Sequence, residues 1–250
     1  KVNAFIRVKQ LQDPEYNMSH NLLFCTRKGV IKKTKLEAYS RPRQNGVNAI
    51  TIREDDQVIQ VRLTTGDSQI IMANKHGRAI RFHESTVREM GRTATGVRGM
   101  TLDETGDDEV IGMICIKDPE KETVMVVSEQ GYGKRSEIED YRITNRGGKG
   151  VKTLNITEKT GNLVAIKSVT DENDLVIINK SGITLRMKVA DVRIMGRATQ
   201  GVRLINLEKR NDEIASVCKV LSETESDSSN SENIDSASEI NEAEASETTE

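Results

Sequence analysis

The chain has 250 residues, with 37 Lys and Arg, 39 Asp and Glu, three cysteines and no Trp. No apolar run approaches membrane-spanning length and no secretory signal is visible, so the sequence predicts neither a membrane span nor export. The odd number of cysteines, each within an apolar strand-like run, favours free thiols over disulfides.

Charge is distributed unevenly along the chain. Residues 221–250 hold ten acidic residues and no Lys or Arg, which leaves 37 basic and 29 acidic residues, about +8 at neutral pH, in residues 1–220. A basic body with an acidic tail is typical of a protein that binds nucleic acid or another polyanion. The tail lacks the apolar residues needed to offset its ordering entropy, so we expect 221–250 to be disordered. Residues 1–220 are long enough for one domain with a sizeable core.

The first predicted element is a strand over residues 1–8. This segment resembles the strand that closes later repeats, such as residues 109–114. We therefore expect an earlier repeat to lie upstream of Lys1.

The rest of the body is a block repeated four times, which we place at 22–65, 66–116, 117–169 and 170–220. Each block contains a run of four apolar residues, and three polar residues then lead to a glycine, at Gly29, Gly77, Gly131 and Gly182. A Gly-Val pair follows, beginning at Gly46, Gly96, Gly150 and Gly201. The spacings of the first set are 48, 54 and 51 residues. Such a period with several short strands per unit predicts an all-β, propeller-like array.

We expect four strands in each repeat. The apolar run predicts a strand buried on both faces, followed by a hairpin with a left-handed glycine and a second strand, for example 30–34. A loop rich in Gly and Arg comes next. The third strand starts at the Gly-Val pair, where the residues four and six positions later are always apolar. A fourth strand, for example 58–63, completes the unit.

Basic residues occur at matched positions in these repeats. Four residues after the hairpin glycine stand Lys33, Arg81, Arg135 and Arg186. Four residues before the second glycine stand Arg92, Arg146 and Arg197, and the shorter first repeat offers Arg41 and Arg43. Two residues after that glycine stand Arg98, Lys152 and Arg203. On blades related by rotation, matched positions would form a curved basic strip that follows a bent phosphate backbone. The alternative is that these charges only keep the outer face soluble.

The loops at 91–96, 145–150 and 196–201 suit contact with phosphate, because small residues let backbone N–H groups approach while Arg or Lys supplies charge. They lack the glycine and Ser/Thr positions of a nucleotide-triphosphate loop. The alternative is a tight structural turn whose charge is incidental.

No catalytic or metal constellation is evident in the sequence. His20, His76 and His83 have no Cys, Asp or Glu partner at metal-ligand spacing. Tyr39 and Tyr141 lie ten residues after the hairpin glycine, where the other repeats have Val87 and Val192. A position that accepts Tyr or Val is interpreted as a packing position rather than a strand-cleaving tyrosine.

The segment Arg146-Gly147-Gly148-Lys149-Gly150 resembles the basic-glycine box found in the C-terminal domain of the DNA gyrase A family. Thr144 and Asn145 replace the Gln and first basic residue of that box, so this copy is degenerate. The resemblance covers residues 1–220 and implies a β-pinwheel that binds, bends and wraps duplex DNA without base specificity. It adds Gly147, Gly148 and Lys149 to the expected DNA contacts and places the best box in a blade upstream.

The same resemblance implies the cellular setting. Partners would be duplex DNA, the N-terminal cleavage domain of gyrase A, and gyrase B, in an ATP-dependent topoisomerase of the bacterial cytoplasm and nucleoid. We expect no cofactor in this chain, since ATP and Mg²⁺ would act elsewhere in the holoenzyme, and we expect the chain alone to be monomeric.

Two other interpretations remain open at this stage. The paralogous C-terminal domain of the topoisomerase IV family has degenerate boxes and fewer blades, and it differs from gyrase mainly in the first blade. A protein-binding propeller scaffold belongs to another class, which the scarcity of aromatic residues, 3% of the chain, disfavours. Salt-dependent binding to arbitrary duplex DNA would separate it from the first two.

Overall fold

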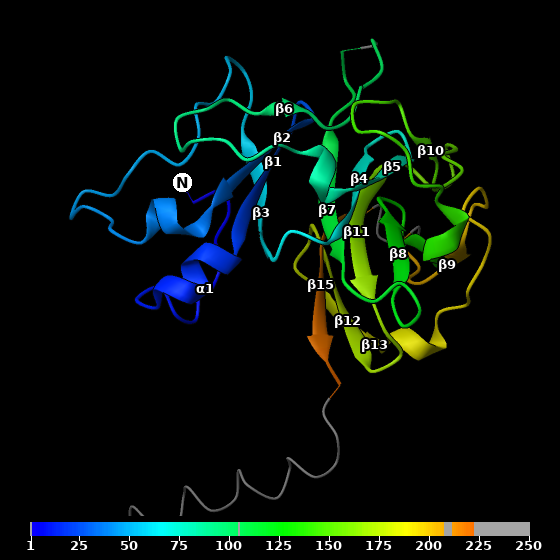
Figure 1. The fold of residues 1–250 in the computed structure, drawn as a ribbon. Helices are drawn as coiled ribbons and strands as arrows, with labels where there is room; N and C mark the ends of the chain where they lie inside the picture. The colour runs from blue at the N-terminus through cyan, green and yellow to red at the C-terminus, as the bar shows by residue number, and fades with distance from the viewer. Residues whose placement is uncertain (1, 105, 208–211, 223–250) are drawn as a thin grey trace, which may run out of the picture.

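The computed structural model describes residues 2–104, 106–207 and 212–222, and within them the chain forms four small antiparallel sheets (Figure 1). The sheets are the blades of a propeller, which confirms the predicted all-β class. One short helix, α1 (Pro14–Ser19), precedes the first sheet and is capped by the Asp13 carboxylate, which accepts from the Glu15 and Tyr16 amides. The expected disordered tail lies outside the described residues, except for Leu221, which ends the last strand, and Ser222.

Each blade has three long strands from one repeat. The first blade uses β1 (Asn21–Thr26), β2 (Val30–Lys35) and β3 (Val58–Thr64). The second uses β4 (Gln69–Asn74), β5 (Arg78–His83) and β7 (Val110–Ile116). The third uses β8 (Thr123–Ser128), β9 (Tyr132–Glu137) and β11 (Leu163–Val169). The fourth uses β12 (Asn173–Asn179), β13 (Thr184–Lys188) and β15 (Ile214–Leu221).

Short 3-10 turns follow the second strand of each repeat, at η1 (Leu36–Tyr39), η2 (Glu84–Thr86), η3 (Ile138–Asp140) and η4 (Val189–Asp191). The fourth strands lie innermost, because β11 packs against both β7 and β15, and β3 packs against β7 (Figure 1). The outer edge of each blade is therefore the edge beyond the second strand.

In the second, third and fourth repeats, the third strand crosses to the preceding blade. These strands have two residues each, β6 (Val97–Arg98), β10 (Val151–Lys152) and β14 (Val202–Arg203), and they pair with β2, β5 and β9 respectively. The prediction that a repeat builds its own four-stranded blade is wrong on this point. The repeats instead exchange one strand, so successive blades are tied together by the chain itself.

The crossing strand ends early because its next amides leave the ladder. In the third repeat, the amides of Thr153 and Leu154 both donate to the Gly77 carbonyl, at 2.8 and 3.3 Å. Gly77 has φ +75°, and a Cβ atom there would lie 2.7 Å from the Leu154 carbonyl oxygen. Glycine is therefore required both for the left-handed turn and for the close passage of the crossing segment. The predicted longer strand is replaced by a bend over this glycine.

The first repeat and the fourth blade do not take part in the strand exchange in the same way as the others. In the fourth blade the described residues form a sheet of three strands, and nothing lies within 4 Å of a Cβ atom placed on Gly182. In the first repeat, residues 46–52, which match the crossing segments, contain no strand. Residues 2–10 also contain no strand, contrary to prediction. Ala4, Ile6 and Val8 instead pack on the cluster around Phe24, so their apolar side chains are covered without pairing along a sheet edge.

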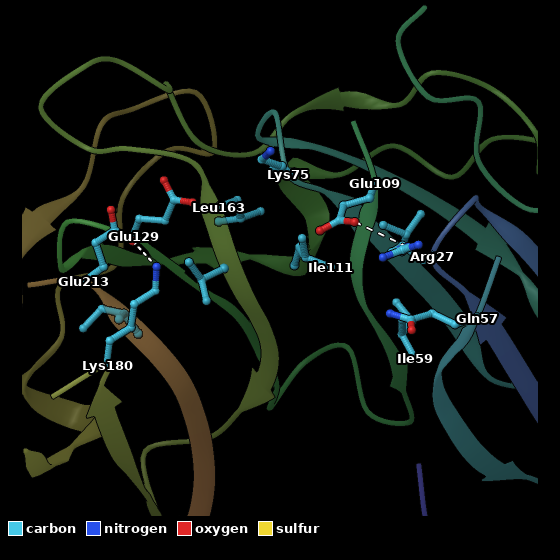
Figure 2. A pocket seen from close by; sticks show the side chains of 13 residues that line it. Arg27, Gln57, Ile59, Lys75, Glu109, Ile111, Glu129, Leu163, Lys180 and Glu213 are labelled. Carbon is cyan, nitrogen blue, oxygen red and sulfur yellow. Dashed lines mark hydrogen bonds and ion pairs between the residues drawn. The ribbon is translucent and has the colours of Figure 1, made fainter. Parts of the chain in front are cut away.

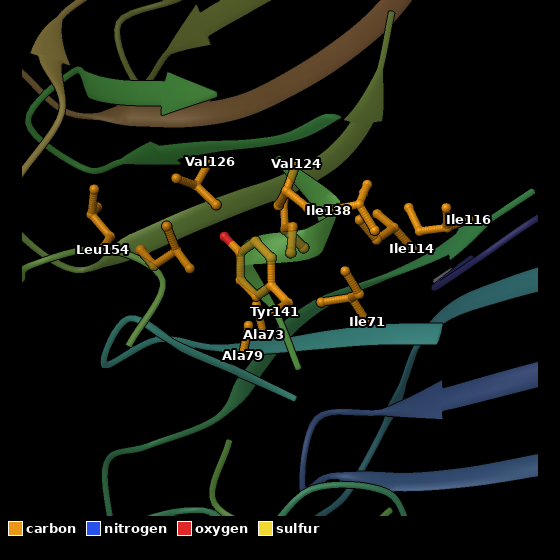
Figure 3. Packing of buried hydrophobic residues seen from close by; sticks show 12 residues of the cluster. Ile71, Ala73, Ala79, Ile114, Ile116, Val124, Val126, Ile138, Tyr141 and Leu154 are labelled. Carbon is orange, nitrogen blue, oxygen red and sulfur yellow. The ribbon is translucent and has the colours of Figure 1, made fainter. Parts of the chain in front are cut away.

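The core is divided into clusters between neighbouring blades. Figure 3 shows Tyr141 among Ile71, Ala73 and Val126, which belong to the second and third blades. Its hydroxyl forms a hydrogen bond with Thr153, so the polar end of the ring is satisfied inside the protein. Tyr141, Val87 and Val192 are all buried, which confirms the prediction that this position serves packing.

Candidate nucleic-acid interface

Three of the matched basic residues are buried between blades rather than exposed on a rim. Lys33, Arg81 and Arg135 are 4–7% exposed. Each donates to a carbonyl at the start of the next repeat's 3-10 turn: Lys33 Nζ to Glu84, Arg81 Nη1 to Ile138 and Arg135 Nη1 to Val189. Their expected role as DNA contacts is therefore corrected, because their donors are used to hold consecutive blades together.

Arg81 shows how completely such a side chain is engaged. Its Nη1 donates to the carbonyls of Ile138 and Tyr141, both at 2.8 Å, and its Nε donates to Gln69 Oε1 at 2.8 Å. Arg135 adds an ion pair with Asp171 at 2.6 Å. In the fourth repeat the matching Arg186 is exposed and donates to Asp174 Oδ2 at 2.8 Å.

Two buried lysines that sequence reasoning missed support the Gly/Arg loops. Lys32 Nζ donates to the Arg92 carbonyl and Lys134 Nζ to the Gly196 carbonyl, both at 2.6 Å. Burial lowers the pKa of Lys32 to about 8, with Arg92 acting in the same direction. Burial also lowers the pKa of Lys134 to about 8, although Asp140 opposes the shift. Adjacent residues on a strand point to opposite faces, and both members of each pair, Lys32–Lys33 and Lys134–Arg135, are buried, so protein covers both faces of the second strand here.

The exposed basic residues lie on the outermost strands of three blades. Arg98 on β6, Lys152 on β10 and Arg203 on β14 are all exposed. Arg203 lies over the Tyr132 ring, 5.5 Å from its centroid, and donates to the Tyr132 hydroxyl at 2.9 Å. Arg41 and Arg43, from the first repeat, are also exposed. We call Arg98, Lys152 and Arg203 the rim residues.

The Gly/Arg loops rest on the rim strand of the preceding repeat. Arg146 Nη1 donates to the Arg98 carbonyl at 3.0 Å, and Arg197 Nη1 donates to the Lys152 carbonyl at 2.9 Å. Arg146 and Arg197 are half-buried as a result, and Arg92 is half-buried as well. Arg146 and Arg197 therefore each lie beside a rim residue of the neighbouring repeat, and the structure brings these two predicted sets together.

In the box loop, the backbone is partly committed to the protein. The Gly147 amide donates to the Gly99 carbonyl at 2.7 Å, and the Gly148 carbonyl accepts from the Thr101 amide at 3.0 Å. Lys149 remains exposed. Of the box residues, Lys149 thus presents the more accessible charge, while Arg146 holds the loop in place.

A second set of exposed arginines was missed. Arg88, Arg142 and Arg193 directly follow the packing positions Val87, Tyr141 and Val192, and all three are exposed. Arg142 and Lys149 line a hollow of about 310 Å³ beside β5. The sequence could have indicated these residues, since an arginine follows the same packing position in three repeats.

The propeller axis has mixed charge. A pocket of about 350 Å³ lies where hairpins of all four blades converge, and in it Arg27 pairs with Glu109 at 3.6 Å and Lys180 pairs with Glu213 (Figure 2). Lys75 and Glu129 also line it. Because these opposite charges offset one another, the axis does not extend the basic surface of the rim.

One histidine prediction is wrong. His76 has carboxylate neighbours, because the hairpin after β4 folds against the turn that precedes β7. Sequence spacing gave no indication of this, since Asp103 is 27 residues away.

Among the described residues, no helix is long and apolar enough to cross a membrane. All three cysteines are free.

The sequence pattern of the DNA gyrase C-terminal domain, a beta-propeller, matches residues 20–65, 68–117, 122–170 and 173–218. The DNA gyrase A protein of Staphylococcus aureus strain NCTC 8325 is 45% identical over 231 residues, which cover 92% of this chain and 25% of that relative. The gyrase A protein of strain MRSA252 is 48% identical over 206 residues, 82% of this chain and 23% of the relative. The chain thus spans about a quarter of the length of these relatives.

Solved structures of related domains have the same fold. The crystal structure of the C-terminal domain of DNA topoisomerase IV superposes with a TM-score of 0.77 at 27% identity, covering 84% of this chain and 64% of that one. A DNA gyrase A C-terminal domain gives 0.72 at 27% identity, covering 82% and 67%. With its repeats, exchanged strands and basic rim, the chain belongs to the DNA gyrase C-terminal domain family.

Proposed function

We propose that this chain binds duplex DNA without sequence specificity and bends it around the blade rims, as the C-terminal domain of a DNA gyrase A protein. The observation that carries the proposal is the pairing of loop and rim. Arg146 contacts the Arg98 segment and Arg197 contacts the Lys152 segment, which aligns basic groups of consecutive blades into one strip. A continuous strip can follow a bent phosphate backbone and releases counterions along its length.

The proposed DNA contacts are the exposed side chains of this strip. They comprise Arg41, Arg43, Arg88, Arg98, Arg142, Lys149, Lys152, Arg193 and Arg203, with the half-buried Arg92, Arg146 and Arg197 at their flanks. Contacts to phosphate position DNA but carry no sequence information. Nothing in this set resembles a catalytic constellation, so the chemistry of strand cleavage would belong to another part of the protein.

The test measures, by fluorescence anisotropy, the affinity of the chain for several unrelated DNA duplexes over a series of salt concentrations. Arg98→Ala should weaken binding to every duplex alike and reduce the salt slope by roughly one unit. Lys121→Ala is the matched control, since its side chain is 80% exposed and pairs only locally with Asp118. If Arg98→Ala weakened binding to one sequence only, the rim would read bases and the proposal would be wrong. If the chain showed no salt-dependent binding to arbitrary duplex DNA, the scaffold interpretation would be favoured.

Gyrase is favoured over topoisomerase IV because relatives at 45% and 48% identity are gyrase A proteins. We propose that the chain acts with a cleavage domain and gyrase B, in the bacterial cytoplasm, to support ATP-dependent negative supercoiling. The full-length gyrase A protein, assembled with gyrase B, should introduce negative supercoils into relaxed DNA. Relaxation without supercoiling would favour the topoisomerase IV alternative.

A further inference from the structure

The turn between β6 and β7 meets the β4–β5 hairpin in a cluster of one histidine and three carboxylates. His76 Nδ1 lies 3.4 Å from Asp103 Oδ2 and 3.8 Å from Asp108 Oδ1. One ligand atom from each of these three residues fits within 4.8 Å of the others. Ligands held 2.0–2.2 Å from a tetrahedral ion are about 3.3–3.6 Å apart. The 3.4 Å separation of His76 and Asp103 matches this range, and the 3.8 Å separation of His76 and Asp108 is slightly wider.

Asp108 supplies an observation independent of the clustering. Its side chain is fully buried, and its Oδ1 has no hydrogen-bond partner while it faces the imidazole. The other oxygen, Oδ2, accepts from Asn74 Nδ2 at 2.6 Å and from the Asp103 amide at 3.1 Å. A buried carboxylate oxygen without a hydrogen bond is costly in free energy unless a cation approaches it, and at Asp108 Oδ1 that cation is either a protonated His76, 3.8 Å away, or a metal ion.

The second nitrogen of the histidine has a carboxylate partner that can orient the ring. His76 Nε2 lies 3.4 Å from Asp107 Oδ2, and Lys75 Nζ approaches the same oxygen at 3.9 Å. In the tautomer whose Nε2–H donates to Asp107, the Nδ1 lone pair is directed at Asp103 and Asp108. This is the carboxylate–histidine–metal arrangement of zinc proteins.

We propose that His76 Nδ1, Asp103 Oδ2 and Asp108 Oδ1 bind a divalent transition-metal ion of the Zn²⁺ class, with Asp107 orienting the histidine. One imidazole and two carboxylates favour such an ion over Mg²⁺, which prefers oxygen ligands alone. The side chains of His76 and Asp103 are 25% and 36% exposed, so the ion has a path from solvent and room for water as a further ligand.

The other repeats provide an internal comparison. The hairpin sequence Asn74-Lys75-His76-Gly77 recurs as Asn179-Lys180-Ser181-Gly182, which differs only at the histidine. There the Ser181 hydroxyl donates to Asp212 Oδ2 at 2.6 Å, so the buried aspartate has an internal donor. His76→Ser therefore copies a hairpin that this fold already contains, and it removes the nitrogen ligand of the proposed site.

The site would connect two segments that support the box loop. Asp103 ends the crossing segment whose Thr101 hydroxyl donates to the Gly147 carbonyl at 2.6 Å, and whose Gly99 carbonyl accepts from the Gly147 amide. An ion that joins Asp103 to His76 would fix this segment to the second blade. The proposal does not depend on DNA binding, and its test needs none.

The test is titration calorimetry of ZnCl2 into the metal-free 250-residue chain, with thermal unfolding measured in parallel. We expect one ion per chain and a higher melting temperature with zinc. His76→Ser and Asp103→Asn should abolish both effects, and Asp107→Asn should weaken binding about tenfold or more. Co²⁺ should give tetrahedral visible absorption bands in the unsubstituted chain but not in the His76→Ser and Asp103→Asn chains, and MgCl2 should bind far more weakly.

His83→Ser is the control, since the His83 ring contacts Ser85 away from this cluster and its loss should leave zinc binding unchanged. Circular dichroism establishes that each variant is folded. Zinc binding of equal affinity in the His76→Ser chain would overturn the proposal. So would the absence of zinc binding by the folded, unsubstituted chain at submillimolar concentration.

Discussion

Arg146 donates through Nη1 to the carbonyl of Arg98 at 3.0 Å, which joins the box loop of the third repeat to the rim strand of the second. The Arg146 Nε also donates to the Thr86 carbonyl at 2.9 Å. One guanidinium thus fixes the loop while its neighbour Lys149 remains exposed. Within the box, Arg146 therefore holds the loop in position, and Lys149 supplies the accessible positive charge.

This division predicts different effects for two substitutions. Lys149→Ala should reduce the salt slope of DNA binding by roughly one unit and leave the bend angle nearly unchanged. Arg146→Ala should reduce DNA bending more than Arg197→Ala does, because Arg146 loses contacts to two carbonyls, whereas Arg197 loses its contact to the Lys152 carbonyl. Energy transfer between dyes at the duplex ends measures the bend. Equal bending by the two arginine variants would mean that the box loop has no special role.

The buried clamp at Arg81 predicts a loss of stability. Arg81→Ala leaves the Ile138 and Tyr141 carbonyls without their donor and opens a gap between two blades. We expect a decrease in the free energy of unfolding of about 3 kcal/mol. The matched Arg186→Ala should cost less than about 1 kcal/mol, because Arg186 is exposed. Urea unfolding measures both, and similar losses would contradict the clamp.

These contrasts show what the sequence could and could not supply. The period near 50 residues and the hairpin glycines predicted an all-β array, and the Tyr141 position was correctly predicted to serve packing. Periodicity shows that Arg81 and Arg98 are each matched between repeats, but not which of them faces a neighbouring blade. Which of the two is buried depends on the exchange of strands between repeats. A Gly-Val pair predicts a strand, but it does not predict with which other strand that strand will pair. The same limit hid the approach of Asp103 to His76.

The hairpin glycines predict an order of tolerance to alanine. In Gly77→Ala, the new Cβ atom would lie 2.7 Å from the Leu154 carbonyl oxygen, and the residue would be strained at a φ of +75°. In Gly182→Ala, only the strained φ of +87° applies. Left-handed backbone costs an L-residue about 1–2 kcal/mol, and the backbone contact adds to this for Gly77 alone. Thermal unfolding should show a clearly larger decrease for Gly77→Ala. The reverse order would mean that the crossing segment moves away readily.

The buried lysines predict a pH dependence of stability. The pKa of Lys134 falls from 10.5 to about 8 on folding, so between these values the unfolded chain binds more protons than the folded one. Stability contributed by this group therefore rises as pH increases from about 8 to 10.5, and the penalty is present in full below about 8. Lys134→Leu, which copies Leu185 of the fourth repeat, should remove that part of the rise.

The check is urea unfolding of both chains across this pH range. Lys32 retains its own lowered pKa in the variant, so a smaller rise should persist. Removing Lys32 as well should flatten the curve further. If the Lys134→Leu chain kept the full pH dependence, the lysine would not be the group that titrates.

The acidic tail predicts competition with DNA for the basic rim. All ten carboxylates of the C-terminal segment lie within residues 223–250, and the body to which they are tethered carries about +8. Tethering gives them a high effective concentration, and salt screens their attraction to the rim. Ending the chain after Ser222 keeps β15 whole, together with the hydrogen bond of Ser222 to Asp174. This truncation should raise DNA affinity most at low ionic strength and hardly at all near molar salt.

A tail in which the ten acidic residues are replaced by Gln and Asn is the matched control for length. It should bind DNA as the truncated chain does, because charge rather than bulk is what competes. Equal affinity of the full-length and truncated chains at low ionic strength would contradict competition and favour a solubility role. Affinity raised by truncation but not by neutralisation would instead indicate steric exclusion, since a neutral tail has about the same bulk as the charged one.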